Sequence, residues 1–274
     1  MQLAHTRHDP APTAPDDAVP IVLLHGLGGT QAIWRPIVEP LRELGAVITL
    51  DLPGFGRSAD ASEWTLSNAA DSIVDTLDEL AIERCVLVGH SLGGGVAIRT
   101  ATTHPDRVAS LVLVSPAGFA GTGDGVVSSR LEAIHAAWRL IVRVGSSHLL
   151  RSDAVRDRIF APLVHDTSVI GAREAAELAR GSARGRGSVA ARAAILAVNL
   201  RPELPSITQP TELVWGRQDR IVPFRYASLV ARAIPNAHGH WLDGVGHMPM
   251  WERPQAVIDA VASAARALSS ATAP

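Results

Sequence analysis

The amino-acid sequence predicts an α/β protein built on a mostly parallel, doubly wound sheet. Short apolar runs alternate with longer segments that repeat apolar residues at helical spacing. The apolar runs are continuous, as is typical of strands that helices cover on both faces. With 274 residues, of which 47% are hydrophobic, the chain is long enough to bury a core of this kind.

Four strands and three helices are predicted to alternate in the first part of the chain. The predicted strands are residues 19–25, 46–51, 85–89 and 108–115, and the predicted helices are residues 33–44, 66–80 and 92–104. Parallel neighbours need a crossover connection, which a helix of this length supplies. About 18 residues precede the first of these strands, which leaves the number of strands at the amino-terminal edge open.

The pattern changes after Pro116. Residues 117–205 show helical periodicity alone, with helices expected over 128–144 and 169–180 and a glycine- and arginine-rich exposed loop over 181–188. The α/β pattern then resumes with a strand over 211–215, a helix over 224–233, a strand over 240–243 and a helix after Pro254. We therefore expect a core of residues 1–116 and 206–274, with a helical cap of residues 117–205 inserted after the fourth strand.

The composition of the chain argues against several classes of binding partner and catalytic group. The formal net charge of −2 indicates neither nucleic acid nor an anionic membrane as a partner. All 25 basic residues are arginine, which excludes a Schiff-base lysine, a P-loop lysine and a Ser-Lys dyad. The single cysteine, Cys85, excludes an internal disulfide, and its apolar neighbours predict a buried side chain. With no signal-peptide pattern and no apolar run of about 20 residues, we expect a soluble, cytoplasmic protein that acts on a small molecule.

The strongest local motif is Gly89-His90-Ser91-Leu92-Gly93. It follows an apolar strand and opens a helical pattern, a context that makes the five-residue match far more specific. A sharp turn at this point exposes the serine hydroxyl, and glycines relieve crowding against the strand and helix. Ser91 is the predicted nucleophile, although serine is also a common helix N-cap.

A serine nucleophile requires a histidine base and a group that orients the histidine. His247 follows the last predicted strand, and Asp219 follows the strand before it. Loops after parallel strands meet at one edge of the sheet, so Ser91, Asp219 and His247 are expected to come together there. Asp243 is the second candidate for the acid.

The oxyanion that forms after attack needs backbone N–H donors. The nucleophile turn offers the amide of Leu92, and the glycine-rich turn after the first predicted strand offers the amide of Leu27. Trp34, Leu131 and Trp138 are expected to line the substrate pocket.

Three further groups of residues have simpler interpretations. His238 and His240 would share one face of a strand, but the sequence offers no third ligand beside them, so no metal site is predicted. His25 and His90 are expected to be structural members of their motifs. Asp51 is expected to stabilise its glycine- and proline-rich loop.

Five ordered motifs resemble the α/β-hydrolase superfamily, in particular its capped single-domain esterase, lactonase and carbon-carbon hydrolase branch. They comprise residues 25–29, 51–58, the turn at Ser91, residues 216–223 and residues 246–254. The resemblance implies an α/β-hydrolase fold, a Ser91-His247-Asp219 triad and oxyanion donors at Leu27 and Leu92. Serine as the nucleophile argues against the epoxide hydrolase and haloalkane dehalogenase branches, which use aspartate there.

The sequence thus predicts a cofactor-independent serine hydrolase that cleaves a carboxylic ester, lactone or thioester of a small-molecule acyl substrate through an acyl-enzyme. Two alternatives stay open because one fold supports many chemistries. The first is an acyltransferase, lyase or carbon-carbon bond hydrolase with the same triad. The second is a non-catalytic ligand-binding protein.

Overall fold

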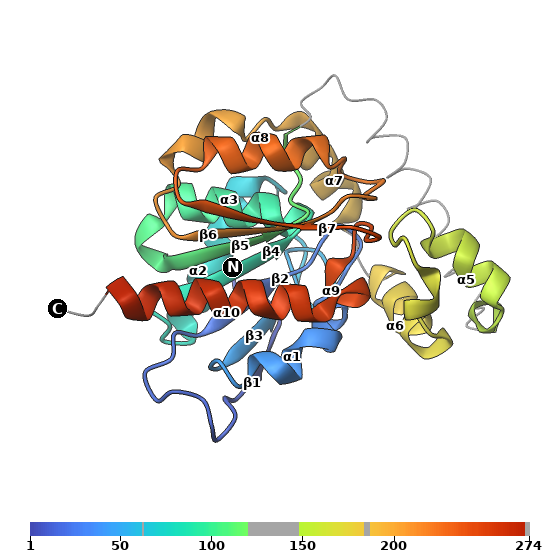
Figure 1. Ribbon diagram of the computed structural model, residues 1–274, viewed down its shortest axis with the longest axis horizontal. Helices are drawn as coiled ribbons and strands as arrows, with labels where there is room; N and C mark the ends of the chain where they lie inside the picture. Colours follow the sequence, from blue (N-terminus) through green and yellow to red (C-terminus); the bar gives the residue numbers. More distant parts are fainter. Residues whose placement is uncertain (62, 120–147, 184–186, 272–274) are drawn as a thin grey trace.

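A computed structural model describes residues 1–61, 63–119, 148–183 and 187–271, and it confirms the predicted α/β architecture. Its sheet has seven strands in the order β1-β3-β2-β4-β5-β6-β7 (Figure 1). Six strands are parallel, and β1 pairs antiparallel with β3 at one edge. The strand order reverses beside β2, so β4 lies inside the sheet, where parallel α/β folds place their sites.

The central strands are buried along their whole length, as their continuous apolar runs predict. They are β2 (Ile21–Leu24), β3 (Val47–Leu50), β4 (Cys85–His90), β5 (Val108–Val114) and β6 (Thr211–Gly216). All the strands that the sequence predicts are therefore present. The core consists of these strands and the apolar faces of the helices on both sides.

The two edge strands show where the local pattern was weak. β1 (His5–His8) was not predicted, because its four polar residues lack an apolar alternation and it pairs only with β3. β7 (Ala237–Leu242) begins three residues before the prediction, since its first residues, Ala-His-Gly, form no apolar run and none of the strand is fully buried. The earlier start brings His238 into the strand, directly opposite Glu212 of β6.

Helices cover both faces of the sheet (Figure 1). α2 (Leu66–Glu79) packs on α3 (Leu92–Thr103), with α8 (Arg225–Ala233) on the same side, and α1 (Arg35–Leu41) packs on α10 (Pro254–Ala271) across the sheet. The helix predicted over 33–44 is shorter than expected. A 3-10 turn over Gln31–Trp34 precedes α1, because the Thr30 hydroxyl accepts the amide of Ala32 and caps the turn.

Between β5 and β6 the described residues form helices and connecting segments. The α-helices are α5 (Asp153–Phe160), α6 (Ala172–Ala183) and α7 (Ser188–Ala197), and the 3-10 turns are Leu149–Arg151, Thr167–Val169 and Arg201–Ser206. The helix expected over 128–144 lies outside the described residues. The loop expected over 181–188 was wrong at both ends, since α6 continues to Ala183 and α7 starts at Ser188. A single glycine such as Gly181 costs a helix only about 1 kcal/mol, which neighbouring helix formers offset.

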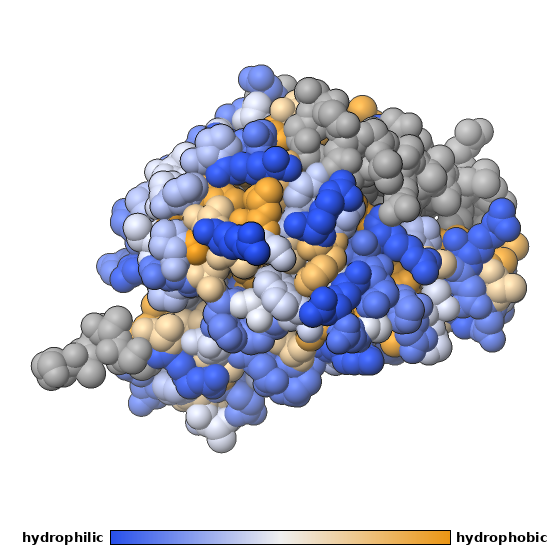
Figure 2. Space-filling view, turned by 45° about the horizontal axis from the view of Figure 1, so that its top comes forward, coloured by the Kyte–Doolittle hydropathy of each residue, from blue (hydrophilic) through white to orange (hydrophobic). Residues whose placement is uncertain are grey.

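Polar side chains dominate the surface. Hydrophilic residues surround smaller apolar areas on the face shown in Figure 2. Among the described residues, the large hydrophobic side chains that are exposed are Met1, Leu149 and Val189. No helix in the described segments has the length and apolar character needed to cross a bilayer.

Candidate active site

The backbone at Ser91 is strained in the way that the glycine-flanked motif predicts. Ser91 lies between the end of β4 and the start of α3 with φ 52° and ψ −114°, a conformation that non-glycine residues rarely adopt. Its N–H donates to the Val114 carbonyl at 3.0 Å, and its carbonyl accepts from Ala117 at 2.9 Å. Strain of this kind costs about 1–3 kcal/mol and persists only where the surroundings hold it.

The two glycines of the motif are required by close backbone packing. A Cβ on Gly93 would lie 2.5 Å from the Leu24 carbonyl oxygen, at the end of β2. A Cβ on Gly89 would lie 2.4 Å from the Gly93 carbonyl oxygen. Because main-chain atoms cannot move aside, only glycine lets α3 start so close to β2 and β4.

His247 and Asp219 form a buried pair. The Nδ1 atom of His247 lies 2.8 Å from Oδ2 of Asp219, and the two side chains are 4% and 0% exposed. The other carboxylate oxygen accepts the backbone N–H groups of Ile221 and Val222 at 2.8 and 2.9 Å. A carboxylate only accepts hydrogen bonds, so Nδ1 carries the proton and Nε2 is left as the basic nitrogen.

The rival acid, Asp243, lies elsewhere. Its side chain is 84% exposed and forms an ion pair with Arg217 at 3.0 Å. The geometry thus pairs His247 with Asp219, the first choice of the sequence analysis.

His90 links the nucleophile turn to the His247 loop. Its Nε2–H donates to the His247 carbonyl oxygen at 2.8 Å, and the centroids of the two rings are 4.8 Å apart. Ser91 follows His90 directly, so the same contact brings the serine and His247 to one end of the sheet. Among the described contacts no hydrogen bond joins the Ser91 hydroxyl to His247.

The backbone amides of Leu27 and Leu92 lie beside Ser91 and have no partner among the described residues. Within the described part of the chain, neither N–H donates a hydrogen bond to another described residue. Leu92 is the first residue of α3, where the helix dipole favours negative charge. Both residues line the same cavity as Ser91.

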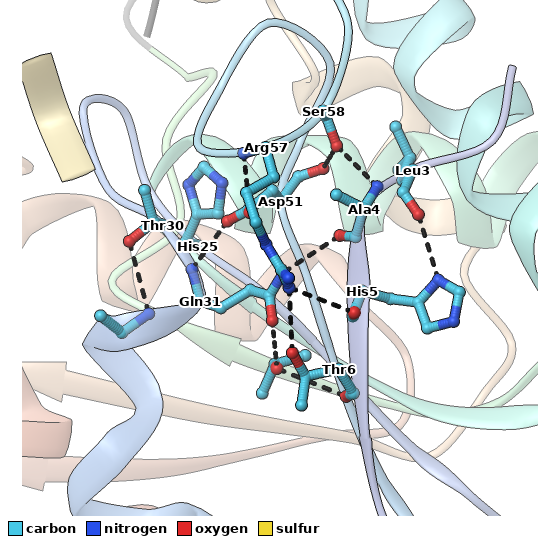
Figure 3. A network of polar contacts seen from close by, with 12 residues as sticks. Leu3, Ala4, His5, Thr6, His25, Thr30, Gln31, Asp51, Arg57 and Ser58 are labelled. Atoms are coloured by element: carbon cyan, nitrogen blue, oxygen red, sulfur yellow. Dashed lines mark hydrogen bonds and ion pairs between the residues drawn. The ribbon is translucent and has the colours of Figure 1, made fainter. Parts of the chain in front are cut away.

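A polar network fixes the loop that carries Leu27. His25 donates from Nδ1 to the Gly26 carbonyl and accepts the Leu52 amide at Nε2, which makes it the structural residue expected. Burial lowers the pKa of His25, although its bond to Gly26 opposes the effect. Asp51 accepts the amides of Gln31 and Arg57, and Figure 3 shows how these contacts extend to the amino-terminal strand.

The cavity beside Ser91 is mainly apolar. Its described lining residues come from the core and from the segments around β5 and α7: Leu27, Ser91, Leu92, Ala117, Gly118, Phe119, Ile195, Leu196, Ile221, Val222 and Tyr226. Such a lining suits the apolar part of a small-molecule ligand.

Of the three predicted pocket residues, only Trp34 lies within the described chain. Trp34 is not among the described lining residues. It is fully buried and packs edge-on against the ring of His90 at a centroid distance of 6.4 Å. Leu131 and Trp138 lie outside the described residues. Phe119 and Tyr226 were missed, because one aromatic residue in an apolar stretch carries no signal of its surroundings.

The segment between β5 and β6 holds the His247 loop in place. The Leu163 carbonyl accepts the His247 amide at 2.7 Å. The Glu252 carboxylate accepts the amides of Gly246, His165 and Asp166 at 2.7, 2.7 and 3.0 Å. Burial raises the pKa of Glu252, while these hydrogen bonds act in the opposite direction. Glu252 belongs to the motif of residues 246–254, but the sequence did not indicate that its carboxylate binds these three amides.

The sequence of the chain matches that of a known protein family. The family model described as alpha/beta hydrolase fold matches residues 19–254. The protein therefore belongs to the alpha/beta hydrolase family.

Similar proteins include several enzymes of this family. The chain is 33% identical over 251 residues to the pimeloyl-[acyl-carrier protein] methyl ester esterase of Aeromonas hydrophila, covering 88% of this chain and 93% of that protein. It is 32% identical to the dihydrolipoyllysine-residue acetyltransferase component of the acetoin cleaving system of Cupriavidus necator, over 85% of this chain but 60% of that longer protein. A thermophilic esterase from Thermogutta terrifontis superposes with a TM-score of 0.76 at 25% identity, covering 97% and 93% of the two chains.

Proposed function

We propose that this protein is a serine hydrolase that cleaves a carboxylic ester, lactone or thioester through an acyl-enzyme. The observation that carries the proposal is the buried Asp219–His247 hydrogen bond, at the end of the sheet where Ser91 is strained. The nearby amides of Leu27 and Leu92 donate to no other described residue. The similarity to an ester-cleaving relative supports the reaction class.

The proposed mechanism has two steps. In the first, Ser91 Oγ attacks the acyl carbon while His247 Nε2 accepts its proton, and the Leu27 and Leu92 amides stabilise the oxyanion. His247 then gives the proton to the leaving group. In the second step, His247 activates a water that hydrolyses the acyl-Ser91 ester. Asp219 holds the imidazole in the required tautomer throughout. The chemistry needs no cofactor.

A substrate panel tests this proposal. Turnover is measured on esters, lactones and thioesters of graded acyl length, with Ser91→Ala, Asp219→Asn and Ser228→Ala as variants. Ser228 is an exposed serine of α8 and serves as the control. We expect Ser91→Ala to lower kcat by about 10⁴-fold or more, and Asp219→Asn by about 10³-fold or more, while Ser228→Ala keeps the wild-type rate.

Two further measurements separate the alternatives. A fluorophosphonate is expected to label the wild type once and Ser91→Ala not at all. Product analysis with and without an acceptor alcohol distinguishes hydrolysis from acyl transfer. Wild-type turnover by Ser91→Ala would refute the mechanism, and absent labelling together with absent turnover would favour a binding protein.

A further inference from the structure

Three side chains that the proposed hydrolase mechanism does not use converge between β6 and β7. Glu212 and His238 are directly paired across the two strands, and His240 projects from the same face of β7 as His238. Oε2 of Glu212 lies 3.0 Å from Nδ1 of His238 and 2.7 Å from Nε2 of His240. The three potential ligand atoms all lie within 4.8 Å of one another.

The carboxylate at the centre of this cluster is held in position. Glu212 is buried, and the Ser263 hydroxyl of α10 donates to its Oε1 atom at 2.6 Å. That bond directs Oε2 towards the two imidazoles. The planes of the histidine rings are nearly perpendicular, at 87°, and the His238 side chain is 72% exposed. One side of the cluster is therefore accessible to solvent.

Two imidazole nitrogens and one carboxylate oxygen form a ligand set that suits zinc and neighbouring divalent transition metals. Ligand atoms on a tetrahedral zinc ion are about 3.3 Å apart, given metal–ligand distances near 2.0–2.2 Å. The observed separations to Oε2, 3.0 and 2.7 Å, are about 0.3 and 0.6 Å shorter, and the two imidazole nitrogens lie within 4.8 Å of each other. Small side-chain rotations, which an exposed histidine tolerates, would make room for the ion.

We propose that Glu212, His238 and His240 bind a divalent transition metal ion of the zinc class, with a solvent molecule in the fourth position. Ser263 orients the carboxylate through its free oxygen, as partners of metal ligands commonly do. The sequence alone indicated only the two histidines, since Glu212 lies 26 and 28 residues away from them and is placed beside them by strand pairing.

The proposed site lies away from the triad. Glu212 is near the start of β6, whereas Asp219 follows its end, and four residues of strand span roughly 13 Å. A bound ion would tie the edge strand β7 to β6 and to α10. The expected effect is on stability, because no reacting atom of the proposed hydrolysis lies there.

Metal binding is tested on the full chain, which carries no histidine tag and has been treated with EDTA to remove bound metal. Zinc ions are added in calorimetric titration and in thermal unfolding, with magnesium ions as the hard-cation control. We expect one zinc ion per chain and a rise of several degrees in Tm, with no response to magnesium. His238→Gln, a change at an exposed side chain, should weaken zinc binding at least tenfold and remove the rise in Tm.

His104→Gln is the matched control, because His104 also faces a carboxylate, that of Asp71, but has no second histidine beside it in the described part of the chain. It should bind zinc as the wild type does. Equal Tm values of metal-free wild type and His238→Gln would show that the variant folds. The proposal is overturned if zinc leaves the wild-type Tm unchanged, or if His238→Gln binds zinc as tightly as the wild type.

Discussion

The Nε2 atom of His90 donates a hydrogen bond to the main-chain oxygen of His247 across 2.8 Å, although 157 residues separate them in the chain. The bond joins the turn that carries Ser91 to the loop that carries the proposed base. Nδ1 of His90 is buried and has no hydrogen-bond partner among the described residues, which agrees with a neutral ring. Burial, followed by repulsion between the two imidazoles when His247 is also protonated, lowers the pKa of His90 well below 6.5.

The lowered pKa values of His25 and His90 predict a loss of stability in acid. A histidine with a lowered pKa in the folded state binds its proton more readily when the chain is unfolded. The free energy of unfolding is therefore unaffected by this histidine above pH 6.5, and it falls as the pH drops below that value. His25 and His90 should each add up to about 1.4 kcal/mol per pH unit to the slope.

Urea unfolding at several pH values between 7.5 and 5 measures this slope. His90→Gln should reduce the slope by up to about 1.4 kcal/mol per pH unit, the contribution of one proton, because the variant has no imidazole to protonate on unfolding. A slope equal to that of the wild type would contradict the assignment of His90 as a buried neutral histidine.

Gly93→Ala should destabilise the protein by about 1–3 kcal/mol or more, since its Cβ would collide with the carbonyl oxygens of Leu24 and His25 at 2.5 and 2.6 Å. Chemical denaturation gives the free energy of unfolding. Gly171→Ala is the control, because among the described residues a Cβ there meets only the side-chain carboxylate of Glu174, which can rotate away. Equal losses in the two variants would show that backbone crowding is not the reason for glycine at position 93.

Glu252→Gln should lower the free energy of unfolding by about 1–3 kcal/mol. The carboxylate accepts three amides through both of its oxygens, whereas the NH₂ group of glutamine accepts none. Glu39→Gln, at a side chain that is 79% exposed, serves as the control and should change stability by less than about 0.5 kcal/mol. If Glu252→Gln unfolds at the same urea concentration as the wild type, the three hydrogen bonds to the Glu252 carboxylate contribute nothing to stability.

Cys85 should resist thiol reagents in the native protein. Burial raises the pKa of its thiol to about 12, so only about one molecule in 10⁴ carries the reactive thiolate at pH 8. Native protein and protein unfolded in urea are mixed with a chromogenic disulfide reagent and the release of its thiolate is followed. One thiol should react at once in urea and react at least a hundredfold more slowly without it. Rapid reaction of the native protein would place Cys85 at the surface.

Much of the core followed from the sequence because its signals are local. Burial on both faces leaves a continuous apolar run, and helix packing leaves a 3.6-residue period, so the predictions for β2 to β6, α2 and α3 needed no knowledge of the fold. The same holds for the turn at Ser91, whose glycines reflect crowding between neighbouring elements. The polar edge strand β1 leaves no such pattern and was missed.

Long-range relationships required the tertiary structure. The sequence ranked Asp219 above Asp243 by position in the chain, but only the fold shows that the first is buried against His247 while the second pairs with Arg217 in solvent. The fold also brought Glu212 of β6 beside His238 of β7. The sequence by itself determined which segments are buried and which turn is strained, because these depend on neighbours along the chain. Which side chains meet was decided by strand pairing and loop packing, which depend on residues far apart in sequence.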